Sequence, residues 1–102
     1  MTDRPKLPNL LELARHLAES GDYVLLKHAR ERSAERAITE PEWNYVLRTG
    51  WHEKRKDSYD EFYESWAYSI RGKTVDGREL RVVVSFDDDT EMLIITLIDL
   101  SV

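Results

Sequence analysis

The spacing of apolar residues changes at Gly50, and this change restricts the folds open to the chain more than any other feature. Before Gly50, apolar residues recur every three or four positions, as in Leu10, Leu13 and Leu17, which is the period of a helix face. After it they alternate, as in residues 80–86, which is the period of a strand. Helices followed by strands predict an α+β domain, with N-terminal helices packed on an antiparallel sheet.

Two helices are predicted in the N-terminal part of the chain. Residues 8–20 have the apolar spacing of a helix, and Gly21 supplies a C-terminal stop. Residues 28–37 contain no Gly, Pro or β-branched residue and are rich in Ala, Arg and Glu, which also favours a helix. Residues 22–27 suit a short strand or the entry to the second helix, and residues 1–6 suit a frayed terminus.

The segment Thr39-Glu40-Pro41-Glu42 has the sequence of a helix capping box. The Thr39 hydroxyl can accept from the backbone N–H of Glu42, while the Glu42 carboxylate reaches back to Thr39. Pro41 suits the first turn, because its missing N–H would have no helical partner there. We therefore expect a helix that ends at Gly50 and buries the apolar residues Trp43, Val46 and Leu47.

The C-terminal half predicts a sheet of about four strands, counted from its alternating or apolar segments. Residues 51–56 are expected to form an exposed edge strand. Residues 66–70 and 80–86 flank the Asp76-Gly77 hairpin signal, and residues 92–100 form the last segment. The last segment is apolar on both faces, so we expect it in the middle of the sheet with helices over one face. The acidic and aromatic stretch 57–64 is expected to be a loop.

Length and composition indicate one globular domain over residues 1–102, with a tail and helix over 1–21 and an α+β core over 22–102. The chain is 41% hydrophobic and 34% charged, which excludes a disordered or low-complexity sequence. It has no cysteine, so disulfides, thiolate metal sites and cysteine nucleophiles are excluded. Because no segment has the pattern of a membrane span or a signal peptide, we expect a cytoplasmic protein.

The net charge of −5 is unevenly distributed along the chain. Residues 1–56 carry a balance of +2, and residues 57–102 carry −7. Within the first part, residues 27–56 reach +3. The overall charge disfavours a general polyanion binder, but binding depends on the local field, so a basic surface remains compatible with this composition.

His28, Arg32 and Arg36 lie four residues apart and therefore share one stripe of the predicted second helix. Guanidinium groups bind phosphate, and an imidazole titrates near neutral pH. An RNA-cleaving site uses these groups, histidine to move protons and arginine to stabilise negative charge. The alternative is a structural role, in which carboxylates such as Glu35 pair with the arginines.

Two further groups of basic residues are candidates for binding. His52, Lys54, Arg55 and Lys56 follow Trp51, and charge beside an aromatic ring can hold single-stranded nucleic acid, although lysines also protect exposed strand edges. Arg71 and Arg81 come close if their strands pair, and they would then repel each other unless an anion or an acid joins them. The three aspartates at 87–89 lack the spaced ligands of a calcium loop and predict a solvated turn.

The run from His28 to Thr39, followed by the capped helix, resembles the small bacterial domains of unknown function in family 4258. Their pattern is His-Ala-x-x-Arg-x-x-x-Arg-Gly-Ile-Ser/Thr, then a short helix, an aromatic strand ending in Gly, an Asp-Gly hairpin, a Val-rich strand and a closing strand with Ile-Thr. The resemblance covers roughly residues 24–100. Ala37 stands where the family usually has Gly, so a left-handed backbone at this position would be strained.

The resemblance implies a RelE-like fold and a metal-independent endoribonuclease of toxin–antitoxin type, with no cofactor and with RNA and a small antitoxin protein as partners. The family's recurrent positions imply His28 as general acid or base and Arg32 and Arg36 as phosphate ligands, with Tyr68 and Arg81 as further catalytic positions. The basic residues His52, Lys54, Arg55 and Lys56 would follow the RNA backbone. The alternative function is a non-catalytic module that binds a protein or a small ligand.

Overall fold

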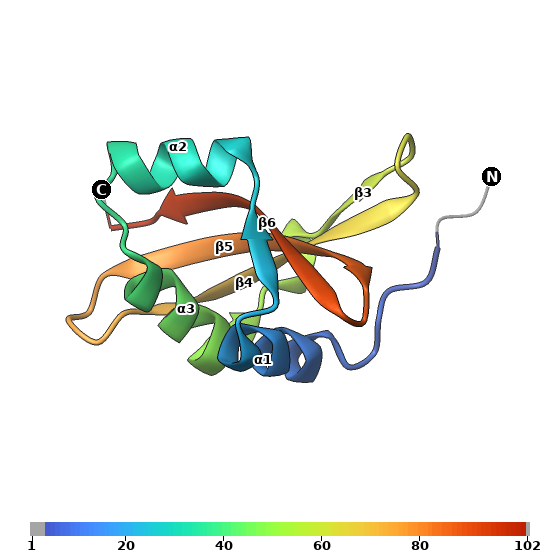
Figure 1. The fold of residues 1–102 in the computed structure, drawn as a ribbon, viewed down its shortest axis with the longest axis horizontal. Helices are drawn as coiled ribbons and strands as arrows, with labels where there is room; N and C mark the ends of the chain where they lie inside the picture. Colours follow the sequence, from blue (N-terminus) through green and yellow to red (C-terminus); the bar gives the residue numbers. More distant parts are fainter. Residues whose placement is uncertain (1–3, 102) are drawn as a thin grey trace.

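Three α-helices, six strands and one short 3-10 helix follow one another in the structure, a computed structural model that describes residues 4–101 (Figure 1). The helices are α1 (Leu10–Ser20), α2 (Lys27–Glu35) and α3 (Glu40–Thr49), and the 3-10 helix is η1 (Lys54–Lys56). The strands are β1 (Tyr23–Leu25), β2 (Trp51–His52), β3 (Ser58–Asp60), β4 (Ser65–Lys73), β5 (Glu79–Asp88) and β6 (Glu91–Asp99). The α+β class is confirmed. In the described part of the chain, no helix is both long and apolar enough to cross a membrane.

The strands form a mixed sheet in the order β1-β6-β5-β4-β2, and β3 also pairs with β4. β1 runs parallel to β6, and the other pairs are antiparallel. The expectation of about four antiparallel strands is therefore wrong in number and direction. β1 and β3 have three residues each, which is too short for a recognisable alternation, and long-range packing alone sets the direction of β1.

One face of the sheet holds the hydrophobic core, with α1 and α3 lying across it (Figure 1). Trp43, Val46 and Leu47 of α3 are buried there, as their helical spacing predicts. The strands contribute alternate residues to the same core, among them Ile70, Val82, Val84 and Ile94. α2 lies along β6 beyond the end of β1, where its small residue Ala29 is buried.

The C-terminal end of α3 lies very close to β4 because two glycines meet there. A Cβ atom on Gly50 would lie 2.5 Å from the carbonyl oxygen of Arg71, and one on Gly72 would lie 3.0 Å from the Cα of Gly50. Larger residues would push α3 away from the sheet. This contact places Trp51, the residue after Gly50, in register with Arg71.

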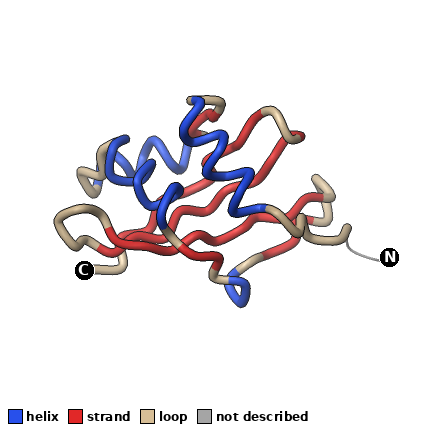
Figure 2. Tube along the Cα trace, turned by 90° about the horizontal axis from the view of Figure 1, so that it is seen from below, coloured by secondary structure: helices blue, strands red, loops and turns tan. Residues whose placement is uncertain are grey.

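The opposite face of the sheet carries only η1 and no α-helix within residues 4–101, as Figure 2 shows. The exposed strand expected over residues 51–56 is present only at β2. After it, Glu53 turns inward and is buried, and the next three residues form η1. Burial of the Glu53 side chain thus overrides the alternating pattern, and the loop expected over residues 57–64 contains β3.

Residues 4–9 contain no helix or strand, yet hydrogen bonds join them to the sheet. The indole N–H of Trp66 donates to the carbonyl oxygen of Arg4 at 2.6 Å, and the backbone N–H of Leu7 donates to the Tyr68 hydroxyl at 2.9 Å. The expectation of a frayed terminus over residues 1–6 is therefore wrong for residues 4–6. Residues 1–3 lie outside the described part of the chain.

The connection between α2 and α3 combines two local features read from the sequence. The capping box of Thr39 and Glu42 is confirmed, and the Thr39 N–H donates to the Glu42 carboxylate at 2.9 Å. Ala37, at the position where the family pattern has Gly, has a left-handed backbone with φ +51°. Arg78 secures this turn by donating to the Ala37 carbonyl oxygen at 3.0 Å while pairing with Asp99 at 2.8 Å.

Candidate functional site

A row of side chains crosses the helix-free face of the sheet from β2 to β5. Trp51 pairs in register with Arg71, and Arg71 pairs with Arg81. Successive residues of a strand point to opposite faces, so residues paired in this way lie on the same face. The close approach of Arg71 and Arg81 expected from pairing of their strands is confirmed.

The carboxylate of Glu53 lies between the two arginines. Arg81 donates to it twice, from Nε to Oε1 at 2.7 Å and from an Nη to Oε2 at 3.2 Å. Arg71 donates to Oε2 at 3.1 Å. Glu53 is held in place by its own backbone N–H, which donates to the carbonyl oxygen of Ser69 at 2.8 Å. Glu53 is therefore the acid that joins the two like charges.

These contacts fix the charge state of the group. Hydrogen bonds from Arg81 hold the pKa of the Glu53 carboxyl below its usual range, and Arg71 adds to this effect, whereas burial acts in the opposite direction. Hydrogen bonds to Glu79 and Glu53 raise the pKa of Arg71. Both shifts favour the ionised forms of Glu53 and Arg71. We call Glu53, Arg71 and Arg81 the Glu–Arg cluster.

The surroundings of the Glu–Arg cluster are accessible and basic. The side chain of Glu53 is only 7% exposed, but that of Arg71 is 28% exposed and that of Arg81 14%. Trp51 is 51% exposed, and the guanidinium of Arg71 lies 6.0 Å from the centre of its ring. Three exposed cations follow Glu53 directly in η1, namely Lys54, Arg55 and Lys56. The site can therefore offer guanidinium and ammonium groups to the negative charges of a ligand, and an aromatic ring on which planar rings of the same ligand can stack.

The three residues singled out on α2 lie elsewhere. His28 is on the outer surface of the helix with its side chain 78% exposed, and its Nδ1 is 3.5 Å from Glu31. Arg32 pairs with Glu35 at 3.1 Å, as the structural alternative predicts, and Arg36 is the C-terminal cap residue. No hydrogen bond or ion pair within residues 4–101 joins this stripe to Tyr68 or Arg81.

Tyr68 and His52 lie together on the helix-covered face. Tyr68 is 3% exposed, and burial raises the pKa of its hydroxyl. The centre of the His52 ring is 5.9 Å from that of Tyr68, and its Nε2 is 2.6 Å from the buried carboxylate of Asp57, which also pairs with Lys6 at 2.9 Å. The predicted catalytic residues are thus divided among three places, and only Arg81 belongs to the Glu–Arg cluster. Of the predicted RNA-binding residues, those of η1 lie beside it, whereas His52 does not.

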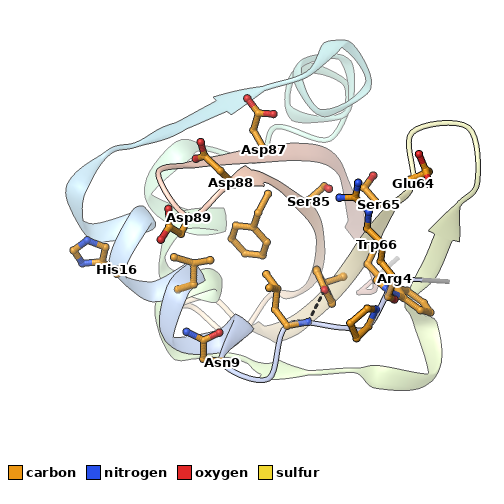
Figure 3. A pocket seen from close by; sticks show the side chains of 15 residues that line it. Arg4, Asn9, His16, Glu64, Ser65, Trp66, Ser85, Asp87, Asp88 and Asp89 are labelled. Carbon is orange, nitrogen blue, oxygen red and sulfur yellow. Dashed lines mark hydrogen bonds between the residues drawn. The ribbon is translucent and has the colours of Figure 1, made fainter. Parts of the chain in front are cut away.

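A separate hollow of about 690 Å³ lies between the N-terminal segment, α1 and the ends of β4 and β5 (Figure 3). The three aspartates at 87–89 stand on one side of it, with Arg4 and Trp66 on the other. The Asp88 carboxylate stabilises the turn, since it accepts a hydrogen bond from the backbone N–H of Thr90 at 2.7 Å. Within residues 4–101, no group of three or more potential ligand side chains has the arrangement of a metal site.

The profile of the domain of unknown function DUF4258 matches residues 25–99. The chain belongs to the DUF4258 family. The matched region contains every residue of the Glu–Arg cluster, together with Trp51 and η1, whereas α1 lies outside it. Comparison with curated proteins and with solved structures gives no match.

Sequence reasoning missed Glu53 and underestimated Arg71. The signal that could have found them was the expected meeting of Arg71 with Arg81, because two paired arginines call for a carboxylate. Glu53 was read as one polar position of an exposed strand. Only its burial distinguishes it from its charged neighbours, and burial is not visible in a run of seven polar residues.

Proposed function

We propose that this DUF4258 domain is a RelE-like endoribonuclease of toxin–antitoxin type that cleaves RNA without a metal ion at the Glu–Arg cluster. One observation carries the proposal. An ionised carboxylate lies between two guanidinium groups on an open face of the sheet, beside an exposed tryptophan and a basic turn. A base and positive donors for phosphate are the two components that intramolecular cleavage of RNA requires.

In the proposed reaction, Arg71 and Arg81 donate to the non-bridging oxygens of the scissile phosphate. Glu53 accepts the proton of the adjacent 2′-hydroxyl, whose oxygen attacks phosphorus as the bond to the 5′ oxygen breaks. The leaving oxygen takes a proton from water at this open face, which yields a 2′,3′-cyclic phosphate and a 5′-hydroxyl. Bound phosphate competes for the guanidinium groups and adds a negative charge nearby, so it raises the pKa of Glu53 and makes it a better base.

The neighbouring residues suit a single-stranded substrate. Base stacking on Trp51 requires an unstacked base, which a strand outside a duplex provides. Lys54, Arg55 and Lys56 supply charge for the phosphates on either side of the cleaved bond. The acidic overall composition does not oppose this contact, because binding depends on the local field and the three cations of η1 adjoin the two arginines of the cluster.

The stripe on α2 is a second surface that contacts RNA, and it takes no part in the cleavage. The carboxylate partners of His28 and Arg32 lie on the same helix and are themselves about half exposed. Exposed ion pairs of this kind contribute about 0–1 kcal/mol, so a polyanion displaces them easily.

The second candidate is a non-catalytic binding module. It is favoured by the saturation of Glu53, whose carboxylate already accepts three hydrogen bonds from arginines. In that case the Glu–Arg cluster is an ion-pair network that joins β4, β5 and the turn after β2, and the exposed residues around it bind without cleaving.

A single-stranded RNA oligonucleotide labelled at its 5′ end separates the two candidates. Purified protein is incubated with it in excess EDTA, and a matched oligonucleotide in which hydrogen replaces each 2′-hydroxyl serves as the control. The endoribonuclease proposal expects cleavage of the RNA to fragments ending in a cyclic phosphate, and an intact deoxy control. Intact RNA, or equal cleavage of both oligonucleotides, would refute the proposed chemistry.

A further inference from the structure

A groove of about 1060 Å³ lies beside the hairpin formed by β3 and β4. Its floor includes Ala67, Ser85 and Leu93, which come from three neighbouring strands. Ser85 pairs in register with Leu93, and Ala67 precedes Tyr68, the residue that pairs with Val84. Ala67 and Ser85 have small side chains, so they leave space between the larger side chains that surround them. The groove lies near the start of β4, whereas Arg71 of the Glu–Arg cluster lies near its end.

The lining combines an apolar interior with acidic edges. Apolar and aromatic side chains include Tyr59, Trp66, Phe86, Leu93 and Ile95. Carboxylates are supplied by Asp60, Glu61, Glu64 and Asp87, and the single cation in the lining is Arg4. Next to these carboxylates, Phe62 and Tyr63 at the tip of the hairpin are 84% and 73% exposed. Such a surface repels phosphate and attracts positive charge.

Ser85 supplies a hydroxyl group to the lining of the groove. The residue as a whole is only 7% exposed, but its hydroxyl is not one of the buried polar atoms without a partner, since Arg15 Nε alone has that status within residues 4–101. Figure 3 shows Ser85 between Asp87 and Trp66, two residues that also line the groove. A hydroxyl group both donates and accepts hydrogen bonds, so a molecule in the groove can bond to it. The backbone of an extended peptide carries both donors and acceptors for that purpose.

We propose that this groove binds an extended basic segment of a partner protein. Alternating side chains of an extended segment point in opposite directions, so apolar ones can enter the groove while lysines or arginines meet the carboxylates at its edges. The backbone of the segment passes over Ser85 and bonds its hydroxyl. The inference is independent of the proposed ribonuclease activity, because the groove shares no residue with the Glu–Arg cluster.

Titration of isotope-labelled protein with a peptide of about eight alternating lysines and leucines tests the proposal by NMR, with a glutamate and leucine peptide as the charge control. We expect saturable shifts of the amide signals of Ala67, Ser85 and Leu93 with the basic peptide and none with the acidic one. Shifts confined to another surface, or no binding, would overturn the inference.

Two matched triple variants separate a built site from general attraction to an acidic protein. Glu61→Gln/Glu64→Gln/Asp87→Asn should weaken the basic peptide about tenfold, as expected for three edge ion pairs. Glu12→Gln/Glu19→Gln/Glu31→Gln changes the net charge equally, away from the groove, and should leave affinity nearly unchanged. Equal weakening in both variants would contradict the proposal. So would concentration-dependent dimerisation that shifts the groove signals without peptide, because a second copy would then be the occupant.

Ser85→Leu gives a second, uncharged test at the floor of the groove. The larger side chain fills the space above Ala67, so the peptide should bind weakly or not at all while thermal unfolding stays cooperative. Unchanged affinity in this folded variant would overturn the placement of the peptide over Ser85.

Discussion

Arg71 and Arg81 lie directly opposite each other on β4 and β5, and both donate to the carboxylate of Glu53. Like charges at opposed positions of a sheet are destabilising, so the two arginines tolerate this arrangement only because the carboxylate lies between them. Glu79 adds a second carboxylate beside Arg71. This group of charges sits on the face of the sheet that the helices leave free, where a substrate can reach it.

Glu53→Gln should lower the free energy of unfolding by about 1–3 kcal/mol, because it removes the negative charge from a nearly buried hydrogen-bonded group and leaves two arginines facing each other. Urea unfolding of the variant and the wild type measures the change. Glu79→Gln is the matched control and should have a smaller effect, since its side chain is 24% exposed. Equal effects of the two substitutions would contradict the special position of Glu53.

The stability of the protein should fall in acid partly through Glu53. Its pKa is lower in the folded state than its ordinary value of 4.5, so folding favours the ionised form. The resulting stability is fully present above the ordinary value and is lost as the pH falls through the lower folded value. Thermal unfolding from pH 7 to pH 3 should therefore show a smaller acid loss in Glu53→Gln than in the wild type. Parallel curves for the two proteins would show that Glu53 does not contribute.

Ala37→Gly should stabilise the protein by about 0.5–1 kcal/mol. The left-handed backbone at Ala37 costs about 1–2 kcal/mol with a Cβ atom, and the greater freedom of glycine in the unfolded chain returns part of that gain. Ala34→Gly, within α2, is the matched control and should destabilise by about 0.5–1 kcal/mol. Chemical denaturation resolves the opposite signs, and destabilisation by both substitutions would refute strain at residue 37.

The basic turn η1 should contribute charge to RNA binding. If Lys54 and Lys56 each neutralise one phosphate, Lys54→Ala/Lys56→Ala lowers the slope of log affinity against log salt concentration by about 1.4. Fluorescence anisotropy with labelled single-stranded RNA at several salt concentrations measures this slope. An unchanged slope would remove η1 from the RNA interface.

Features fixed by neighbouring residues were predictable from the sequence, and features fixed by distant contacts were not. The Thr39 capping box and the stop at Gly21 depend on a few adjacent residues, and both have the expected form. The left-handed backbone at Ala37 was suggested by the resemblance to the family, whose pattern has Gly at this position. By contrast, the parallel pairing of β1 with β6 joins residues far apart in the chain.

The candidate site shows the same division. The sequence indicated that Arg71 and Arg81, if paired, would repel each other unless an anion or an acid joined them. For an acid, 11 Asp or Glu residues in the C-terminal part alone were candidates. The one that does is Glu53, which the turn into η1 carries beneath the two arginines. Of the stripe predicted from His28, Arg32 and Arg36, the first two lie on α2 and Arg36 is the cap residue after its end. Because α2 lies beside β6, His28 and Arg32 face solvent.

The rate of RNA cleavage by Glu53→Gln tests the central claim most directly. Single-turnover reactions in EDTA, with protein concentrations that saturate the RNA, compare it with the wild type and with His28→Ala/Arg32→Ala, at a temperature where all three are folded. If Glu53 is the general base, its substitution lowers the rate by about 100-fold or more, while the α2 variant cleaves at close to the wild-type rate. Cleavage by Glu53→Gln at the wild-type rate, or loss of activity only in the α2 variant, would contradict the account.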